Sequence, residues 1–212
     1  MQAVARNVAP LAGVLLLGWN ARNVVYLYFV DTLFAMAVIL AGVLRHMHPP
    51  VTTEGVAARL NSEAGVLAGG LAGAALVGLP LAFGLAFMFE FELGIAATLA
   101  DPGFQVAVAW QVAAALSSYA SLAAALQTRT PDELRLRRRF ALVFLRWIAL
   151  LWLAQFTAVL SGPSSAIAFV AVYAVLSTWT EIAPDQFLRV MPGGTDAPPV
   201  AAPPPAKRRK RR

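Results

Sequence analysis

The chain of 212 residues is 59% hydrophobic and only 13% charged, with a mean hydropathy of +0.66. Because about a quarter of the residues of a soluble domain are charged, this composition excludes an ordinary soluble protein. The sequence has no cysteine, which excludes disulfides, thiolate metal sites and cysteine nucleophiles, and much of its net charge of +6 comes from cations clustered in residues 129–139 and 207–212.

The apolar residues form blocks of about 20, the length that a helix needs to cross about 30 Å of hydrocarbon. We therefore predict an all-α, polytopic transmembrane helical bundle. The first block is short, and it is followed by Trp19 and Asn20 rather than by the small residues of a signal-peptide cleavage site, so we expect a short or half-spanning helix. The six predicted membrane segments are residues 8–18, 24–44, 65–89, 105–126, 140–160 and 164–182.

The connectors are predicted from prolines and charges. Pro49 and Pro50 prevent the second segment from continuing. Residues 90–101 are expected to form an acidic loop that turns at residues 101–103. The six segments make a transmembrane domain of residues 1–185, and residues 186–212 are expected to be a disordered Pro/Ala-rich linker with a polybasic tail.

The positions of the cations predict the orientation in the membrane, because cytoplasmic loops carry an excess of Lys and Arg. If the N-terminus is cytoplasmic and all six segments cross, all Lys and Arg residues except Arg22 and Arg146 lie on the cytoplasmic side. If the short first segment does not cross, the distribution of Lys and Arg no longer agrees with this rule. We therefore predict a multi-pass protein of the inner (cytoplasmic) membrane with both termini in the cytoplasm.

Two ionisable residues, Asp31 and Arg146, lie deep inside predicted membrane segments, well away from the segment ends. Such a group costs several kcal/mol unless it is neutralised or paired. Counted along the helices, the two Cα levels differ by roughly 8 Å, which an extended arginine can bridge. We predict an intramembrane ion pair between Asp31 and Arg146, which either only fixes helix register, the favoured interpretation, or makes Asp31 a proton or cation site.

Other polar residues in the segments are more typical of helix interfaces than of substrate binding. Glu181 is at the inner end of its segment, where its carboxylate can reach water, and amides in membrane helices often bridge neighbours. The predicted polar interface residues are Glu181, Gln111 and Gln155.

Small residues in segment 65–89 recur at four-residue spacing, which lets another backbone approach closely. We expect this face to pack against segment 105–126, which carries small residues at the same spacing, although a glycine stripe can also join two protomers. The predicted packing residues are Gly65, Gly69, Gly73, Ser117 and Ser121.

Two basic clusters are predicted to contact anionic lipid headgroups, or simply to anchor the topology. A nucleic-acid partner is not expected, because the tail has no aromatic residues between its cations. His46 and His48 are a weak metal candidate, since residues two apart in a helix point to different sides, and we expect no metal and no cofactor. The clustered cations are Arg135, Arg137, Arg138, Arg139, Lys207, Arg208, Arg209, Lys210, Arg211 and Arg212.

The N-terminal region carries a resemblance in residues 7–14, in Gly18-Trp19 and in residues 26–31, which read Tyr-Leu-Tyr-Phe-Val-Asp. Over residues 7–45 the chain resembles a family of uncharacterised bacterial integral membrane proteins, a domain of unknown function. Asp31 and Thr32 stand where that family usually has glutamate and asparagine. The resemblance implies a membrane fold and singles out Asp31, and it implies no reaction.

We expect a non-enzymatic subunit or scaffold of a membrane assembly, with the lipid bilayer and other membrane subunits or further copies of the chain as partners. One alternative is a small transporter-like or ion-coupled protein that uses Asp31. The other is an intramembrane or lipid-modifying enzyme, which the predicted topology disfavours because it separates Ser161, Ser164 and Ser165 from the histidines across the bilayer.

Overall fold

The computed structural model describes residues 10, 13–14, 16, 19, 21–48, 56–88, 91–159, 163–182 and 186–187. The all-α prediction is confirmed for these residues, among which there is no strand. Most of the predicted segment 8–18, the connector 49–55 and the C-terminal tail lie outside the described residues. The helices are α2 (Ala21–Met47), α3 (Val56–Met88), α4 (Phe91–Ala100), α5 (Pro102–Ala125), α6 (Leu136–Val159) and α7 (Pro163–Ile182).

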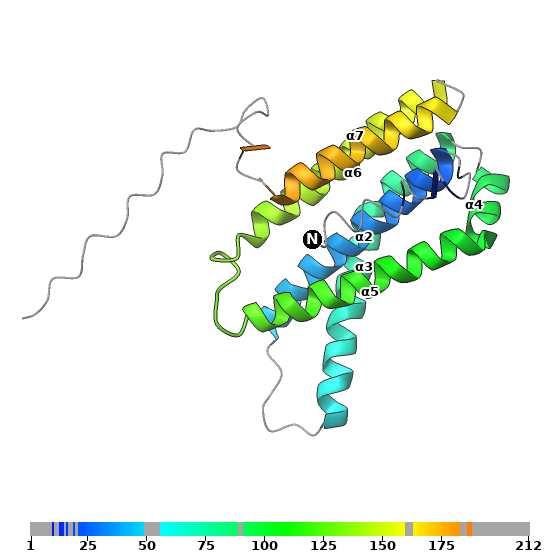
Figure 1. Cartoon of the computed structure of the whole chain (residues 1–212). Helices are drawn as coiled ribbons and strands as arrows, with labels where there is room; N and C mark the ends of the chain where they lie inside the picture. The colour runs from blue at the N-terminus through cyan, green and yellow to red at the C-terminus, as the bar shows by residue number, and fades with distance from the viewer. Residues whose placement is uncertain are drawn as a thin grey trace, which may run out of the picture.

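Helix α2 is the centre of the bundle and contacts each of the other helices. Figure 1 shows it between the α6–α7 pair on one side and α5 on the other. Its side chains are apolar around most of its circumference, and a helix of this kind is stable only when it is surrounded. Val24, Val25 and Leu27 are accordingly completely buried at one end of α2, as is Ala41 near the other.

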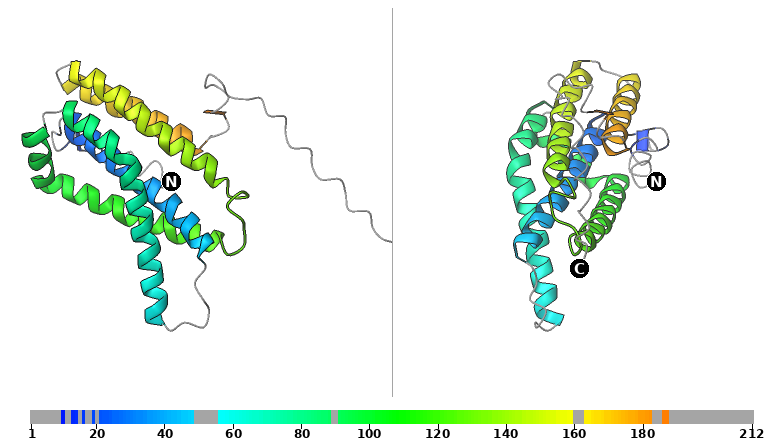
Figure 2. Two further views of the ribbon diagram at one scale, coloured as in Figure 1. Left: turned by 180° about the vertical axis from the view of Figure 1, so that it is seen from behind. Right: turned by 90° about the vertical axis from the view of Figure 1, so that its left-hand side faces the viewer.

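Helix α3 crosses α2, and its N-terminal part extends beyond the other helices, as both views of Figure 2 show. It begins at Val56, well before the predicted start at residue 65. The added turns contain Ala57, Ala58, Leu60 and Glu63, which are good helix formers although the stretch is too polar to belong to the apolar run. At 33 residues α3 is about 50 Å long, which exceeds the hydrocarbon thickness.

The region between α3 and α5 differs from the predicted acidic loop, because residues 91–100 form the short helix α4. Their leucines and alanines favour helix. Asp101 separates the two helices and is the N-cap of α5: its Oδ1 accepts hydrogen bonds from the backbone N–H groups of Gly103 at 2.7 Å and Phe104 at 3.1 Å. Pro102 occupies the first helical position, where its missing N–H is not needed.

Three helices in the described part of the chain are long and apolar enough to cross a membrane, namely Asn23–Met47, Ser62–Gly84 and Pro102–Ala125. The described apolar stretch of α7, Ile167–Thr180, is shorter. Large apolar side chains are exposed on the outer faces of several helices, which is unusual in water and favourable in lipid. Examples are Leu76 and Phe83 of α3, Val106 and Trp110 of α5, Trp152 of α6 and Val175 of α7.

Candidate functional site

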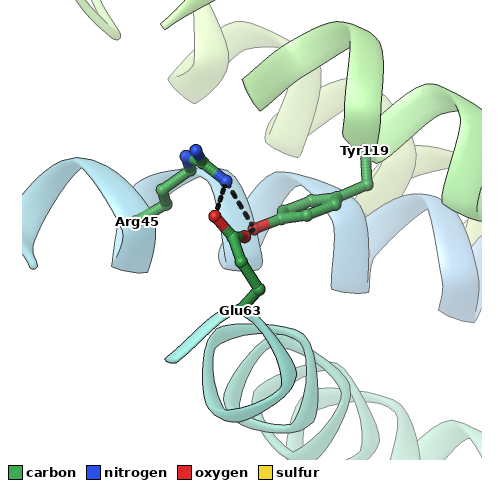
Figure 3. A network of polar contacts seen from close by, with 3 residues as sticks. All are labelled: Arg45, Glu63 and Tyr119. Carbon is green, nitrogen blue, oxygen red and sulfur yellow. Dashed lines mark hydrogen bonds and ion pairs between the residues drawn. The ribbon is translucent and has the colours of Figure 1, made fainter. Parts of the chain in front are cut away.

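A charged network joins three helices where α2 ends (Figure 3). Arg45 of α2 forms an ion pair with Glu63 of α3. The Tyr119 hydroxyl of α5 donates a hydrogen bond to the other carboxylate oxygen of Glu63 at 2.5 Å, and Arg45 Nη1 donates to the Tyr119 oxygen at 3.4 Å. The carboxylate therefore accepts from both neighbouring helices.

This network is partly shielded from solvent, with Tyr119 only 7% exposed. The side chains of Arg45 and Glu63 are 17% and 28% exposed. Sequence reasoning used Arg45 only as a topological cation and did not connect it with Glu63. The sequence does contain a signal for this contact. Arg45 directly follows the second apolar segment and Glu63 shortly precedes the third, so the two opposite charges are expected at the same end of the neighbouring helices.

A second polar network lies where α2 begins. The Thr98 hydroxyl of α4 donates to Asn23 Oδ1 at 3.0 Å, and Asn23 Nδ2 donates to Asp101 Oδ2 at 3.4 Å. Asn23 and Thr98 are both buried. Since Asp101 also caps α5, this network fixes the start of α2 against α4 and α5.

Between these two levels, α2 carries two buried polar residues, Asp31 at 5% and Thr32 at 0% exposure. The Thr32 hydroxyl donates to the Tyr28 carbonyl at 2.8 Å and lies 3.0 Å from the Tyr173 hydroxyl of α7. The rings of Tyr28 and Tyr173 are in contact, with centroids 4.1 Å apart. These contacts of Tyr28, Thr32 and Tyr173 lie on the same part of α2 as Asp31.

Arg146 of α6 is also buried, at 6% exposure, and its hydrogen bonds hold α6 to α7. Its Nε donates to Thr180 Oγ1 at 2.8 Å, and Nη2 donates to the Ser177 carbonyl at 3.2 Å. The next residue, Trp147, stacks on Phe29 of α2 with centroids 5.9 Å apart, so this part of α6 lies near the turn of α2 that contains Asp31. The ion pair between Asp31 and Arg146 remains a prediction.

A cavity of about 390 Å³ lies between α2, α5 and α6. Its polar lining residues come from α5, α6 and α7, and its apolar wall comes chiefly from α2 and α6. Gln111, one of the predicted interface residues, lines this cavity and is only 2% exposed. The polar lining residues are Gln111, Ser118, Arg139, Arg146 and Thr180.

The glycine face of α3 packs differently from the prediction, because α2 rather than α5 lies against it. A Cβ atom on Gly70 would lie 2.6 Å from the Ala37 carbonyl oxygen and 2.7 Å from the Ala41 Cβ, so the two backbones approach each other here. A Cβ atom added to Gly69 or Gly73 would lie 3.0 or 3.1 Å from a leucine side chain of α2, whereas one added to Gly65 would enter open space. The stripe next to the predicted one therefore makes the closest helix contact.

The remaining predicted residues are spread over the molecule. Ser117, Ser121 and Gln155 are exposed, as are His46 and His48 at the end of α2. In the described part of the chain no three His, Cys, Asp or Glu side chains are grouped so that they could hold a metal ion.

The first basic cluster surrounds the start of α6. Arg135 has a φ of 52°, a left-handed turn that precedes the helix. Arg135, Arg137 and Arg139 are exposed, and Arg138 is half-buried. The side chain of Glu181 and the tail cations at 207–212 lie outside what the structure describes.

Comparisons of the chain with protein-family models, with curated proteins and with solved structures gave no match. The N-terminal resemblance to a membrane-protein family therefore remains a prediction.

Proposed function

We propose that the chain is a multi-pass protein of the inner membrane, in which α2, α3, α5, α6 and α7 cross the bilayer together with the N-terminal segment and both termini are cytoplasmic. The two polar networks support this arrangement. Asn23 and Arg45 are separated along α2 by about 33 Å at 1.5 Å per residue, close to the thickness of the hydrocarbon core of about 30 Å. The networks would then lie at the two membrane surfaces.

Within that membrane we propose a non-enzymatic role as a subunit or scaffold of a membrane assembly. The observation that carries this proposal is the outer face of α3, where small residues are exposed and Gly65 has nothing within 4 Å of a Cβ atom. Without a hydrophobic driving force in lipid, membrane helices associate where small residues let backbones approach. The exposed alanines of this face are Ala64, Ala68, Ala72 and Ala75.

The partner of this face is a second membrane helix, from another copy of the chain or from another subunit. The test is purification of the full chain in a mild detergent, followed by native mass spectrometry. We expect a stoichiometric membrane partner or a defined oligomer, which the double variant Ala68→Leu/Ala72→Leu loses. The matched control is Ala109→Leu/Ala113→Leu, which enlarges two exposed alanines of α5. A monomer without partners, or equal loss in both variants, would refute the proposal.

A second candidate function is ion coupling through Asp31. It is favoured by the burial of this carboxyl beside Thr32, the Thr32–Tyr173 hydrogen bond and the aromatic contacts. An ionisable group at such a depth is a functional candidate in a membrane protein. Proton flux into proteoliposomes, reported by a pH-sensitive dye, tests it: wild-type flux that Asp31→Asn abolishes at equal folded yield supports coupling. Absence of flux above that of empty vesicles contradicts it.

A further inference from the structure

The cavity between α2, α5 and α6 contains a buried amide that no neighbouring side chain uses. Gln111 of α5 is only 2% exposed and lines this cavity. Within the described part of the chain, its side-chain amide has no hydrogen-bond partner. A buried polar group of this kind is costly unless something binds it. The amide therefore marks the cavity as a site for a ligand.

The amide lies deep in the membrane on the proposed topology. Gln111 comes nine residues after Pro102, the first residue of α5. At 1.5 Å per residue it is about 14 Å from the outer end of the helix, near the middle of a hydrocarbon core of about 30 Å. The headgroup and ester groups of ordinary phospholipids lie nearer the surface. The ligand therefore has a polar group that itself enters the hydrocarbon.

The hydrogen bonds of the other lining residues show which polar group can bind. The Ser118 hydroxyl donates to the Ala114 carbonyl at 2.9 Å, and the Thr180 hydroxyl donates to the Ser177 carbonyl at 2.8 Å. Both hydroxyl protons are therefore used within their own helices. The Gln111 amide keeps two N–H donors for a ligand, which has to present an acceptor such as a carbonyl oxygen.

The charges around the cavity do not require an anion. Arg146 is held by its hydrogen bonds to α7 and is predicted to pair with Asp31. Arg139, at the start of α6, is exposed. The apolar side chains that line the cavity include Phe34 and Val38 of α2 and Leu142 and Val143 of α6. This wall suits an uncharged ligand with an apolar body.

We propose that this cavity binds an uncharged lipophilic quinone, one of whose ring carbonyls accepts a hydrogen bond from the Gln111 amide. A quinone dissolves in hydrocarbon, has carbonyl acceptors and has no donor of its own, so it matches both the depth of the amide and its free N–H groups. Phe34 provides an aromatic neighbour for the ring. The volume of about 390 Å³ lies within the 300–1,000 Å³ usual for ligand sites, and the tail of the quinone would extend into the bilayer.

The test uses the full chain in a maltoside detergent, incubated with equal amounts of decylubiquinone, dioleoylglycerol and squalene. After gel filtration, mass spectrometry measures the amount of each compound that stays with the protein. We expect about one decylubiquinone per chain. Gln111→Leu should reduce its retention about fivefold, the ratio that corresponds to one hydrogen bond. The matched control is Gln155→Leu, the same change at an exposed position of α6 outside the cavity wall, which should leave retention unchanged.

Ala115→Leu fills part of the cavity and leaves the amide in place, so it should also release the quinone. Melting temperatures of the variants near that of the wild type show that the protein is folded. Squalene has no carbonyl, and its retention at the level of decylubiquinone would overturn the proposal. Equal retention by Gln111→Leu and the wild type would do the same, and stronger retention of dioleoylglycerol would make an acylglycerol the ligand instead.

The site rests on the membrane crossing proposed for α5 and is independent of the interface proposed for α3. Thiol labelling from the two sides of the membrane measures that crossing separately. Failure of the topology and failure of the quinone site therefore give different results.

Discussion

The Tyr119 hydroxyl donates a hydrogen bond to the Glu63 carboxylate at 2.5 Å, although the two residues are 56 positions apart in the chain. Their helices, α5 and α3, each pack along α2 and meet through this contact at the end of α2 where Arg45 lies. The network therefore holds one end of α3 and one end of α5 in place on the central helix.

Removing the phenol should weaken the bundle. Tyr119→Phe removes a shielded hydrogen bond to a charged group, which is worth about 1.5–3 kcal/mol. The measurement is thermal unfolding of the purified protein in detergent. Ser121→Ala is the control, since its exposed hydroxyl bonds only one turn back on the same helix. Combining Tyr119→Phe with Glu63→Ala should cost less than the sum of the single changes, and strict additivity would show that the contact contributes nothing.

The contact between α2 and α3 should tolerate no side chain at Gly70. Gly70→Ala places a methyl group against the Ala37 carbonyl and Ala41, which forces the helices apart and should cost about 1–3 kcal/mol. Gly65→Ala enters open space on the same helix and should be neutral or stabilising by up to about 1 kcal/mol, because alanine favours helix. The melting temperatures of the two variants test this prediction. A lower melting temperature for Gly65→Ala than for Gly70→Ala would contradict the described packing of α3 on α2.

Asp31 and Arg146 should behave as a pair. Removing one partner of a buried pair leaves a charge uncompensated, at a cost of about 3–5 kcal/mol. Asp31→Ala and Arg146→Ala should therefore each lower the yield of folded protein more than the double change does. Fluorescence-detected size-exclusion chromatography of the three variants measures this yield. If the losses simply add, the two side chains do not interact.

Asp101, the N-cap of α5, should contribute to the stability of the folded protein although it lies outside the apolar segments. Asp101→Ala removes the acceptor for the backbone N–H groups of Gly103 and Phe104 and the contact with Asn23. The expected loss is about 0.5–2 kcal/mol. Asp132→Ala, at an exposed position of the connector between α5 and α6, provides the comparison. Equal unfolding temperatures for the two variants would exclude a stabilising cap.

The sequence predicts the helical character well because runs of apolar residues of bilayer length have few other structures available to them. It predicts α2 as residues 24–44, and the helix covers Ala21–Met47. It misses α4, which at 10 residues is too short to be detected as a membrane-crossing run. It also misses the early start of α3, because a search for apolar runs does not detect helix that continues into polar sequence.

Contacts between helices were harder to predict. The spacing of the glycines indicates a close approach, but only the three-dimensional arrangement shows that Gly70 faces Ala37 and Ala41 of α2. The Glu63–Tyr119 contact depends on the relative height and rotation of two helices far apart in the chain. No local pattern in the sequence encodes these quantities.

The central claim, the arrangement across the membrane, is tested most directly by labelling single cysteines in right-side-out and inverted membrane vesicles, because the natural chain has no cysteine. The exposed sites Ala97→Cys on α4 and Gln127→Cys after α5 are combined with Arg208→Cys in the tail. An impermeant thiol reagent should label Ala97→Cys only in right-side-out vesicles, and Gln127→Cys and Arg208→Cys only in inverted ones. Labelling of Gln127→Cys and Arg208→Cys from opposite sides would contradict the account.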